Sequence, residues 1–270
     1  MPDIRAEKGD LLLRQAQGSD EIAACQRLRY RVFYEELGAE PLGDMAQRRM
    51  DIDRFDEICD HLVVVRRDAA EENGNDPVRL SDGSLIGTYR LLRQDVAEAH
   101  GGFYTQAEFD IAPLIASHPN HRFLELGRSC VLKTHRTRPV VELLWQGIWD
   151  YVRAHDIHVM LGCASLEGTD PRQHELALSF LAGASAPPEW SVRAQPEHRV
   201  EMRRLPPETI DHRQALRLLP PLIKGYLRLG CYIGEGAVID RQFNTTDVLI
   251  ILPISAINAR YFEHFGAPNG

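Results

Sequence analysis

Hydrophobic residues recur along this chain with two spacings. Runs of apolar or alternating residues predict strands, and apolar residues three or four positions apart predict helices. Strand-like runs lie at residues 11–16, 61–67, 85–92, 123–133 and 157–164. Apolar residues at helical spacing predict one helix from residue 19 to about 37 and another from 139 to about 153. Ser19 suits the start of the first helix, Gly38 its end, and Pro139 the first turn of the second.

The resulting order is strand, helix, three strands, helix, strand, which predicts an α/β fold. We expect a mixed central sheet flanked by helices on both faces. In the last hundred residues, the pattern predicts helices at 171–182, 219–229 and 255–265, an extended stretch at 198–205 and a buried strand at 248–252. We therefore expect a core at residues 1–165 and a C-terminal α/β extension at 166–270, packed together as a single structural unit.

Composition narrows the class of protein. Hydrophobic residues make up 44% and charged residues 26% of the chain, as in ordinary globular proteins. A net charge of −8 argues against a broad nucleic-acid surface. The five cysteines are far apart with no C-x-x-C pair, which favours a reducing, cytoplasmic setting over disulfides or zinc. The longest strongly apolar run, residues 248–254, is too short to cross a bilayer, although peripheral contact with the inner membrane face stays open.

Several common catalytic motifs are absent from the sequence. It contains no G-x-x-x-x-G-K phosphate loop, no G-x-S-x-G elbow and no H-E-x-x-H or EF-hand spacing. We therefore expect no bound metal and no nucleotide-dependent phosphoryl chemistry. Gly234 and Gly236 form only a weak glycine pair, because no helical pattern follows them.

Unusual polar residues are concentrated in four short segments of the first 165 residues. They are Leu28-Arg29-Tyr30-Arg31-Val32-Phe33-Tyr34-Glu35, Asp53-Arg54-Phe55-Asp56, Gly87-Thr88-Tyr89-Arg90-Leu91-Leu92 and Leu124-Glu125-Leu126-Gly127-Arg128. Glu125 and Arg128 stand in a strand that otherwise suits the interior, on opposite faces if the strand is regular. A bulge at Gly127 would turn both side chains to one side and expose backbone N–H groups that can polarise a carbonyl.

These segments, in this order, resemble those of the acyl-carrier-protein-dependent branch of the Gcn5-related N-acyltransferase superfamily. The resemblance is strongest to the L-ornithine Nα-acyltransferases, which begin ornithine-lipid synthesis. It extends over nearly the whole chain and includes residues 219–230 and 244–248. A more distant resemblance, to the acyl-homoserine lactone synthases, covers roughly residues 1–165.

The resemblance implies transfer of a 3-hydroxyacyl group from acyl carrier protein to the α-amine of L-ornithine, forming lyso-ornithine lipid. It implies no tightly bound cofactor, since the donor is the acyl-phosphopantetheine arm of the carrier. Coenzyme-A-using members carry a glycine-rich loop after the third central strand, whereas residues 134–139 here contain no glycine, which favours the carrier protein. The implied catalytic residues are Glu125 and Arg128, and the implied substrate-binding residues are Arg31, Phe33, Asp53, Asp56 and Arg90. From the expected bulge, we add Gly127 and Ser129 to the catalytic residues, because their backbone N–H groups can hold the oxyanion.

Each of these positions also has a structural explanation. Glu125 can act as general base for the incoming ammonium or form an ion pair with Arg128 or Arg90. The arginines can bind a substrate carboxylate, and the aspartates can bind its ammonium groups, or all can be ordinary surface or capping residues. Four basic residues in an acidic chain suggest a docking surface for acyl carrier protein, with a solvated loop as the alternative. They are Arg122, Lys133, Arg136 and Arg138.

Three other functions stay open at this stage. The acceptor can be glutamine or another amino acid, because the related enzymes have similar motifs. Acyl-homoserine lactone synthesis is disfavoured by the additional C-terminal hundred residues. A membrane-active or binding protein without catalysis is disfavoured by Glu125 and Arg128, which such a protein has no reason to carry in an interior strand.

Overall fold

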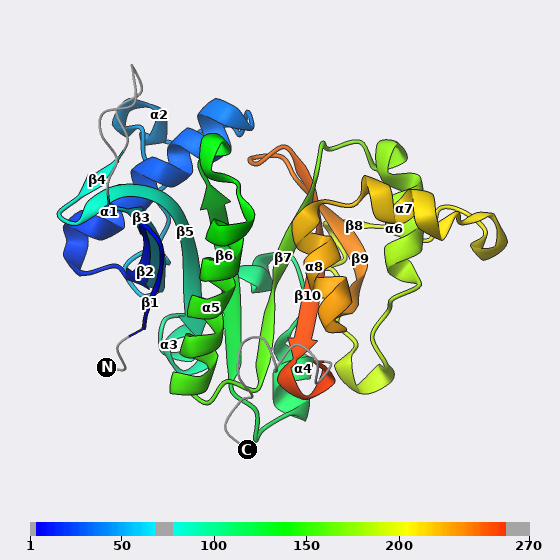
Figure 1. Ribbon diagram of the computed structural model, residues 1–270. Coiled ribbons are helices and arrows are strands. Elements are labelled where there is room, and N and C mark those ends of the chain that lie inside the picture. The colour runs from blue at the N-terminus through cyan, green and yellow to red at the C-terminus, as the bar shows by residue number, and fades with distance from the viewer. Residues whose placement is uncertain (1–3, 68–77, 258–270) are drawn as a thin grey trace. The chain divides into compact units, whose positions relative to one another are not determined.

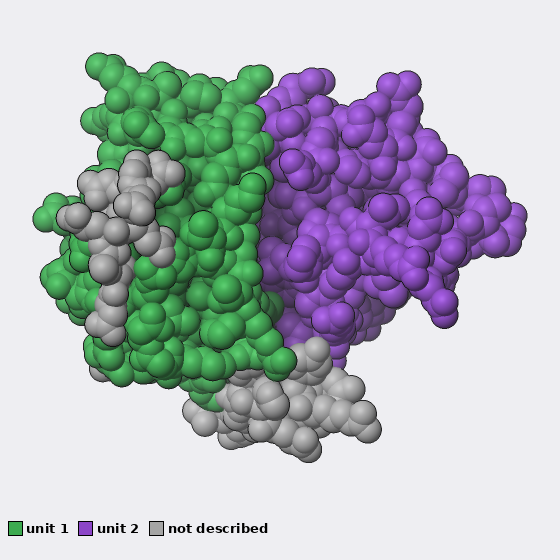
Figure 2. Space-filling model, turned by 45° about the horizontal axis from the view of Figure 1, so that its top comes forward, with its two compact units in different colours: residues 1–100, 126–156, 269 green, residues 101–125, 157–268, 270 purple. Residues whose placement is uncertain are grey.

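The computed structural model describes residues 4–67 and 78–257. The chain divides into two compact units, drawn in green and purple in Figure 2. Unit 1 comprises residues 1–100 and 126–156, and unit 2 comprises residues 101–125 and 157–268. Strand β6 (Phe123–Val131) contributes its first three residues to unit 2 and the others to unit 1.

Unit 1 contains a sheet with the strand order β1-β2-β3-β5-β6. Its first four strands pair in antiparallel fashion, and the short strand β4 (Arg79–Leu80) adds to the edge of β5. These four are β1 (Arg5–Lys8), β2 (Leu11–Gln15), β3 (Asp60–Arg66) and β5 (Gly83–Arg93). The strands predicted at residues 61–67 and 85–92 are confirmed as β3 and β5, which pair with each other.

Two helices cover opposite faces of this sheet (Figure 1). Alternate residues of β5 point to opposite faces. On one face, Thr88 contacts Cys25 of α1 (Gly18–Tyr30). On the other face, Arg93 donates a 2.9 Å hydrogen bond to the Tyr151 hydroxyl of α5 (Arg138–Ala154). The expected flanking of the sheet by helices on both faces is confirmed.

Helix α1 continues into a wider π-helical turn, η1 (Arg31–Glu36), in which the N–H of Leu37 bonds to the carbonyl of Val32. Gly38 then adopts a φ of 75°, a backbone conformation that glycine favours, and ends the helix near the expected residue. The remaining described helical segments of unit 1 are short: α2 (Met45–Arg48), α3 (Gln94–Ala99) and the 3-10 turn η3 (Lys133–His135).

Unit 2 contains a second run of paired strands, in the order β6-β7-β10-β9-β8. Strand β6 pairs with β7 in parallel, over residues 123–125 and 159–161, whereas the other pairs are antiparallel. A mixed sheet is therefore confirmed. The further strands are β7 (Val159–Glu167), β8 (Arg199–Val200), β9 (Tyr232–Asp240) and β10 (Thr245–Pro253).

The helices of unit 2 include α4 (Ala112–Ser117), α6 (Glu175–Ala182), α7 (His212–Leu218) and α8 (Pro221–Leu229). Its 3-10 turns are η2 (Tyr104–Ala107), η4 (Pro171–His174), η5 (Pro188–Trp190), η6 (Pro207–Thr209) and η7 (Ile254–Ala256). Among the described helices, none has the length and apolar character that a membrane span requires.

Strand β9 differs most from expectation, because the sequence pattern did not reveal it. Two of its residues are glycines, Gly234 and Gly236. A Cβ on Gly234 would lie 2.9 Å from Leu249 Cβ of β10, so a glycine is needed where β9 approaches β10. Gly236 has a φ of 91°. Most of the expected helix at 255–265 lies outside the described residues, which end at residue 257, just after η7. The expected boundary at residue 165 lies inside β7 and does not coincide with a boundary between the compact units.

Two helical glycines provide a matched test of packing. A Cβ on Gly147 of α5 would lie 2.5 Å from Leu13 Cδ2 of β2, whereas a Cβ on Gly225 of α8 meets no described atom within 4 Å. We expect Gly147→Ala to lower the free energy of unfolding by about 1–3 kcal/mol through overpacking. Gly225→Ala should raise it by about 0.5–1 kcal/mol through helix propensity. Denaturant unfolding of both variants measures this, and equal effects would contradict the packing of α5 on β2.

Candidate active site

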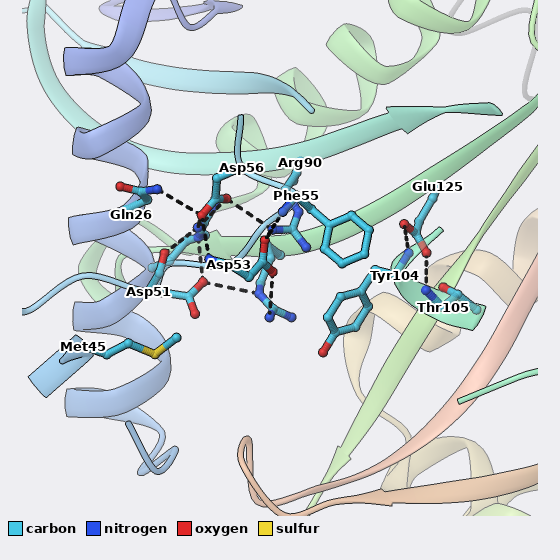
Figure 3. A network of polar contacts seen from close by, with 12 residues as sticks. Gln26, Met45, Asp51, Asp53, Phe55, Asp56, Arg90, Tyr104, Thr105 and Glu125 are labelled. Carbon is cyan, nitrogen blue, oxygen red and sulfur yellow. Dashed lines mark hydrogen bonds and ion pairs between the residues drawn. The ribbon is translucent and has the colours of Figure 1, made fainter. Parts of the chain in front are cut away.

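A closed ring of alternating charges lies in unit 1, where α1, β5 and the unit-1 part of β6 meet the loop that precedes β3. Each aspartate of the ring pairs with two arginines, and each arginine with two aspartates (Figure 3). In ring order the six side chains are Arg29, Asp51, Arg128, Asp53, Arg90 and Asp56. Three positive and three negative charges cancel, so the ring can be buried without a net charge.

Most of the ring is removed from solvent. Arg29 is 0% exposed, and Asp51 and Asp56 are 1% exposed. The Arg29 Nη2 atom lies 2.7 Å from Asp56 Oδ1, and its Nε atom lies 2.8 Å from Asp51 Oδ2. Arg90 Nη1 lies 2.7 Å from Asp53 Oδ1 and 3.2 Å from Asp56 Oδ1. Charge-assisted contacts of this length compensate part of the hydration that the six groups lose.

All three aspartates come from residues 51–56, and the loop is folded by its own polar groups. The N–H of Asp51 donates to the Gln26 carbonyl of α1 at 3.0 Å. The Asp53 carboxylate accepts the N–H of Phe55 at 2.8 Å, and the N–H of Asp53 donates to Asp56 Oδ2 at 3.1 Å. The Phe55 ring is buried, and the Cζ atom of Arg90 lies 5.7 Å from the centroid of this ring. The Asp-x-Phe-Asp segment is therefore a turn that aims carboxylates at the arginines.

Arg128 enters the ring through an unusual backbone conformation. Its φ is 50°, which residues other than glycine rarely adopt inside a strand. Its Nε and Nη2 atoms lie 3.3 Å from Asp51 Oδ2 and Asp53 Oδ2, respectively. The expected backbone irregularity is present, but its left-handed residue is Arg128 and not Gly127. A Cβ on Gly127 would meet no described atom within 4 Å, and Ser129 is half-buried.

Three further side chains contact the aspartates from outside the ring, two at a carboxylate and one at a backbone carbonyl. Gln26 Nε2 donates to Asp56 Oδ2 at 3.0 Å, and the Tyr34 hydroxyl donates to Asp51 Oδ1 at 3.0 Å. His61 Nε2 lies 3.0 Å from the Asp56 carbonyl oxygen. Burial lowers the pKa of His61, so the ring gains no fourth positive charge at neutral pH. The ring is thus fixed on its aspartate side by α1, η1 and β3.

Arg31 was predicted to be the functional arginine of the first segment, but the ring contains Arg29. The helical period carried a signal that we missed: Arg29 follows the buried Cys25 by four residues and precedes the buried Val32 by three. Arg31 is half-buried at the start of η1, and no described residue forms a hydrogen bond or ion pair with its guanidinium. Phe33 is half-buried on the same turn.

Glu125 has its own set of contacts in unit 2. Its Oε1 accepts the N–H of Thr105 at 2.7 Å and its Oε2 accepts the N–H of Tyr104 at 3.0 Å, at the start of η2 (Figure 3). The residue is 5% exposed. Backbone N–H donors favour the ionised carboxylate. A carboxylate oxygen can accept more than one hydrogen bond.

A group of acidic residues lies farther along the same unit. Thr105 Oγ1 is 3.9 Å from Cys163 Sγ, which donates to Glu108 Oε2 at 3.1 Å. Glu108, Asp240 and Asp247 each offer one carboxylate oxygen, and the three oxygens lie within 4.8 Å of one another. Such acidic groups are common in proteins that bind no ion, so the geometry by itself does not indicate a metal centre.

The four basic residues expected to dock a carrier protein lie in exposed segments. Arg136 forms a 2.6 Å ion pair with Glu36, and Arg138 forms one of 2.5 Å with Glu142. Lys133 is exposed at the start of η3. Arg122 is exposed in unit 2, where its N–H donates to His158 Nδ1 at 3.1 Å. Their docking role stays a prediction.

Removing Arg29 tests how much the ring contributes to the free energy of unfolding. Arg29→Met leaves Asp51 and Asp56 buried with one cation fewer, so we expect a loss of about 3–5 kcal/mol in the free energy of unfolding. Arg31→Met, two residues away, should change it by less than about 0.5 kcal/mol. Urea unfolding at neutral pH measures both. Equal losses of unfolding free energy for Arg29→Met and Arg31→Met would contradict a special stabilising role of the ring.

The ring also predicts acid sensitivity. Burial acts to raise the pKa of Asp56, but Arg29 and Arg90 outweigh it and lower the pKa from 3.8 to about 2. This group therefore contributes its full stability above pH 3.8 and loses it as the pH falls toward 2. We expect Asp56→Asn to be less stable than wild type at neutral pH, with a smaller further loss between about pH 5 and 2. Parallel acid-unfolding curves for the two proteins would contradict this assignment.

Comparison with known proteins agrees with the fold. The acetyltransferase (GNAT) domain family matches residues 28–146. The structure of FeeM, an N-acyl amino acid synthase from uncultured soil microbes, aligns with a TM-score of 0.51 over 93% of this chain and 97% of that chain, at 12% identity. The predicted GNAT fold is therefore confirmed.

Curated relatives give a more specific family. The L-ornithine N(alpha)-acyltransferase of Rhizobium meliloti (strain 1021) is 49% identical over 99% of this chain and 88% of its own length. The protein of the same name from Brucella abortus (strain 2308) is 50% identical over 96% of this chain and 90% of its own length. The chain is an acyltransferase and belongs to the L-ornithine N(alpha)-acyltransferase family of GNAT-fold enzymes.

Proposed function

We propose that this enzyme transfers a 3-hydroxyacyl group from acyl carrier protein to the α-amine of L-ornithine, forming lyso-ornithine lipid, the first step of ornithine-lipid biosynthesis. The observation that carries the proposal is identity of 49% over 99% of the chain to a protein named L-ornithine N(alpha)-acyltransferase. Acylation at the α position also suits the chemistry, because an α-ammonium with a pKa near 8 loses its proton more readily than a side-chain ammonium near 10.

The donor assignment rests on the loop that follows β6. Residues 134–139 contain no glycine, so they lack the glycine-rich form with which coenzyme-A-using relatives enclose a pyrophosphate. The arm of acyl carrier protein has a single phosphate, and the carrier itself is acidic. Exposed Lys133, Arg136 and Arg138 match that charge. The phosphopantetheine arm acts as a substrate in this scheme, with no tightly bound cofactor.

In the proposed mechanism, Glu125 takes a proton from the α-ammonium, directly or through water. The free amine attacks the thioester carbonyl, and a C–N bond forms. Backbone N–H groups between Gly127 and Ser129 stabilise the oxyanion. The C–S bond then breaks, and the departing carrier thiolate is protonated.

No covalent intermediate on the protein is required in this scheme. Burial raises the pKa of Cys130, which keeps its thiol protonated at neutral pH and makes it a poor nucleophile. Burial likewise raises the pKa of Cys25 to about 11 and that of Cys231 to about 12. Direct transfer within a ternary complex agrees with the absence of a recognisable Cys/His or Ser/His pair in the sequence.

We assign two different tasks to the arginines. Arg90 and Arg128 each pair with two aspartates, which suits them to fixing the strand that carries Gly127 and Ser129. Asp53 and Asp56, proposed from the sequence as partners of the substrate ammonium groups, share this positioning task. The Arg31 guanidinium has no partner among the described residues and is the better candidate for binding the ornithine carboxylate, with Phe33 beside it on η1.

The reaction can be tested with purified components. The enzyme with 3-hydroxyacyl carrier protein and L-ornithine should release carrier thiol and form Nα-acylornithine. Glutamine, lysine and S-adenosylmethionine in place of ornithine should give at most about a tenth of that rate, since the acceptor pocket must match a dicationic five-carbon amino acid. Faster acylation of glutamine would transfer the assignment to that acceptor. Absence of thiol release with every amine would exclude the proposed enzyme activity.

Glu125→Gln separates a base from a structural group. The amide keeps one acceptor oxygen for η2 but cannot take a proton, so we expect kcat to fall about 10²-fold or more near pH 7. The deficit should shrink above about pH 8, where ornithine loses its α-proton without help. Glu189→Gln, an exposed change on η5, serves as control. A deficit of constant size at every pH would assign Glu125 a structural role only.

A further inference from the structure

Helices α7 and α8 of unit 2 carry apolar side chains that the folded chain does not bury. Leu216, Leu218 and Leu222 are 41%, 56% and 37% exposed. Six large hydrophobic side chains are exposed in the described part of the chain, and these three occur within seven consecutive residues. Single exposed leucines need no explanation, but a local group of three points to contact with another apolar phase.

The core does not require these leucines. The same helices bury a separate set of residues: Ala215, Leu219, Ile223, Tyr226 and Leu229. This set provides the apolar stripe that packs α7 and α8 on the rest of unit 2, α7 against α6 and α8 against β10 (Figure 1).

The same two helices carry an excess of positive charge. No acidic residue occurs between Asp211 and Glu235, a stretch that contains Arg213, Arg217, Lys224 and Arg228. Asp211 is engaged in capping α7, where it accepts the N–H groups of Arg213 and Gln214.

The arginines of α7 and α8 differ from other arginines of unit 2 in whether they form ion pairs with carboxylates. Arg213, Arg217 and Arg228 are exposed, and no carboxylate of the described residues pairs with any of them. Arg172, by contrast, pairs with Asp170, and Arg193 pairs with Glu235. In a chain with a net charge of −8, this concentration of unpaired positive charge favours contact with an anionic partner.

We propose that α7 and α8 form a membrane-docking surface that binds the face of a bilayer containing anionic phospholipids. The arginines and Lys224 attract the charged headgroups, and the three leucines enter the boundary between headgroups and acyl chains. An acidic protein offers carboxylates to the arginines but no hydrocarbon phase to the leucines, so the combination favours a bilayer. The proposal is independent of the acceptor and donor assigned above.

Vesicle sedimentation with the full-length chain tests the surface. Wild type should bind vesicles of phosphatidylcholine mixed with phosphatidylglycerol, bind vesicles of phosphatidylcholine alone weakly, and dissociate as salt is raised. The triple change Arg213→Gln, Arg217→Gln and Arg228→Gln should weaken binding by about tenfold or more. The matched control, Arg172→Gln, Arg193→Gln and Arg199→Gln, removes the same net charge from ion-paired arginines and should leave binding near wild type.

The leucines have a control of their own. Leu216→Ser, Leu218→Ser and Leu222→Ser together should weaken vesicle binding by about tenfold. Val141→Ser and Leu42→Ser, at exposed positions of unit 1, should not. Acyl transfer by the variants in solution should equal that of wild type, and circular dichroism should confirm that they fold.

Three results would overturn the proposal. Wild type that stays in the supernatant with anionic vesicles has no such surface. A control arginine set that weakens binding as much as the α7–α8 set would indicate only a response to net charge. Variants of α7 and α8 that bind vesicles normally but transfer acyl groups slowly from carrier protein would assign the surface to the carrier. Because vesicle binding is measured without substrates, loss of the proposed enzyme activity would not affect this test.

Discussion

The constraint on which unit 1 depends is the burial of six charged groups in one closed ring. Each of these side chains loses hydration, which its neighbours in the ring replace together with Gln26, Tyr34 and backbone N–H groups. Replacing this hydration by ion pairs is favourable only when α1, β5, β6 and the loop at residues 51–56 lie at the correct mutual distances. The ring therefore defines where these elements stand more strictly than apolar packing does, since apolar contacts tolerate small shifts and charged contacts of 2.7 to 3.3 Å do not.

This constraint connects stability to the proposed chemistry. Arg128 has a left-handed backbone that costs free energy, and its two aspartate partners hold it there. Gly127 and Ser129 flank this residue, so the direction of their N–H groups depends on the same contacts. In our proposal, the aspartates contribute to catalysis without touching the substrate, because they determine the shape of the strand that polarises the thioester.

Much of the fold was accessible from the sequence, because the elements of the first 165 residues show clear periods and end signals. Strand β9 was not, since Gly234, Glu235 and Gly236 interrupt its apolar pattern, and the reason for the glycines is contact with β10 and β8. In the site, the motifs indicated Asp53, Asp56, Arg90 and Arg128 correctly as a polar group. Arg29 and Asp51 were missed: Arg29 could have been found from its helical spacing to Cys25 and Val32, whereas the sequence offers no such period for Asp51 in its loop.

The composition of the ring has a consequence for the folding kinetics of unit 1. Its three aspartates lie within six residues, whereas its arginines are distributed over about a hundred positions, from Arg29 to Arg128. Contacts between such distant parts of a chain form late, after the intervening loops have closed. Interactions that are absent from the folding transition state act almost entirely on the rate of unfolding. We therefore expect the ring to slow the unfolding of unit 1 and to leave its folding rate nearly unchanged.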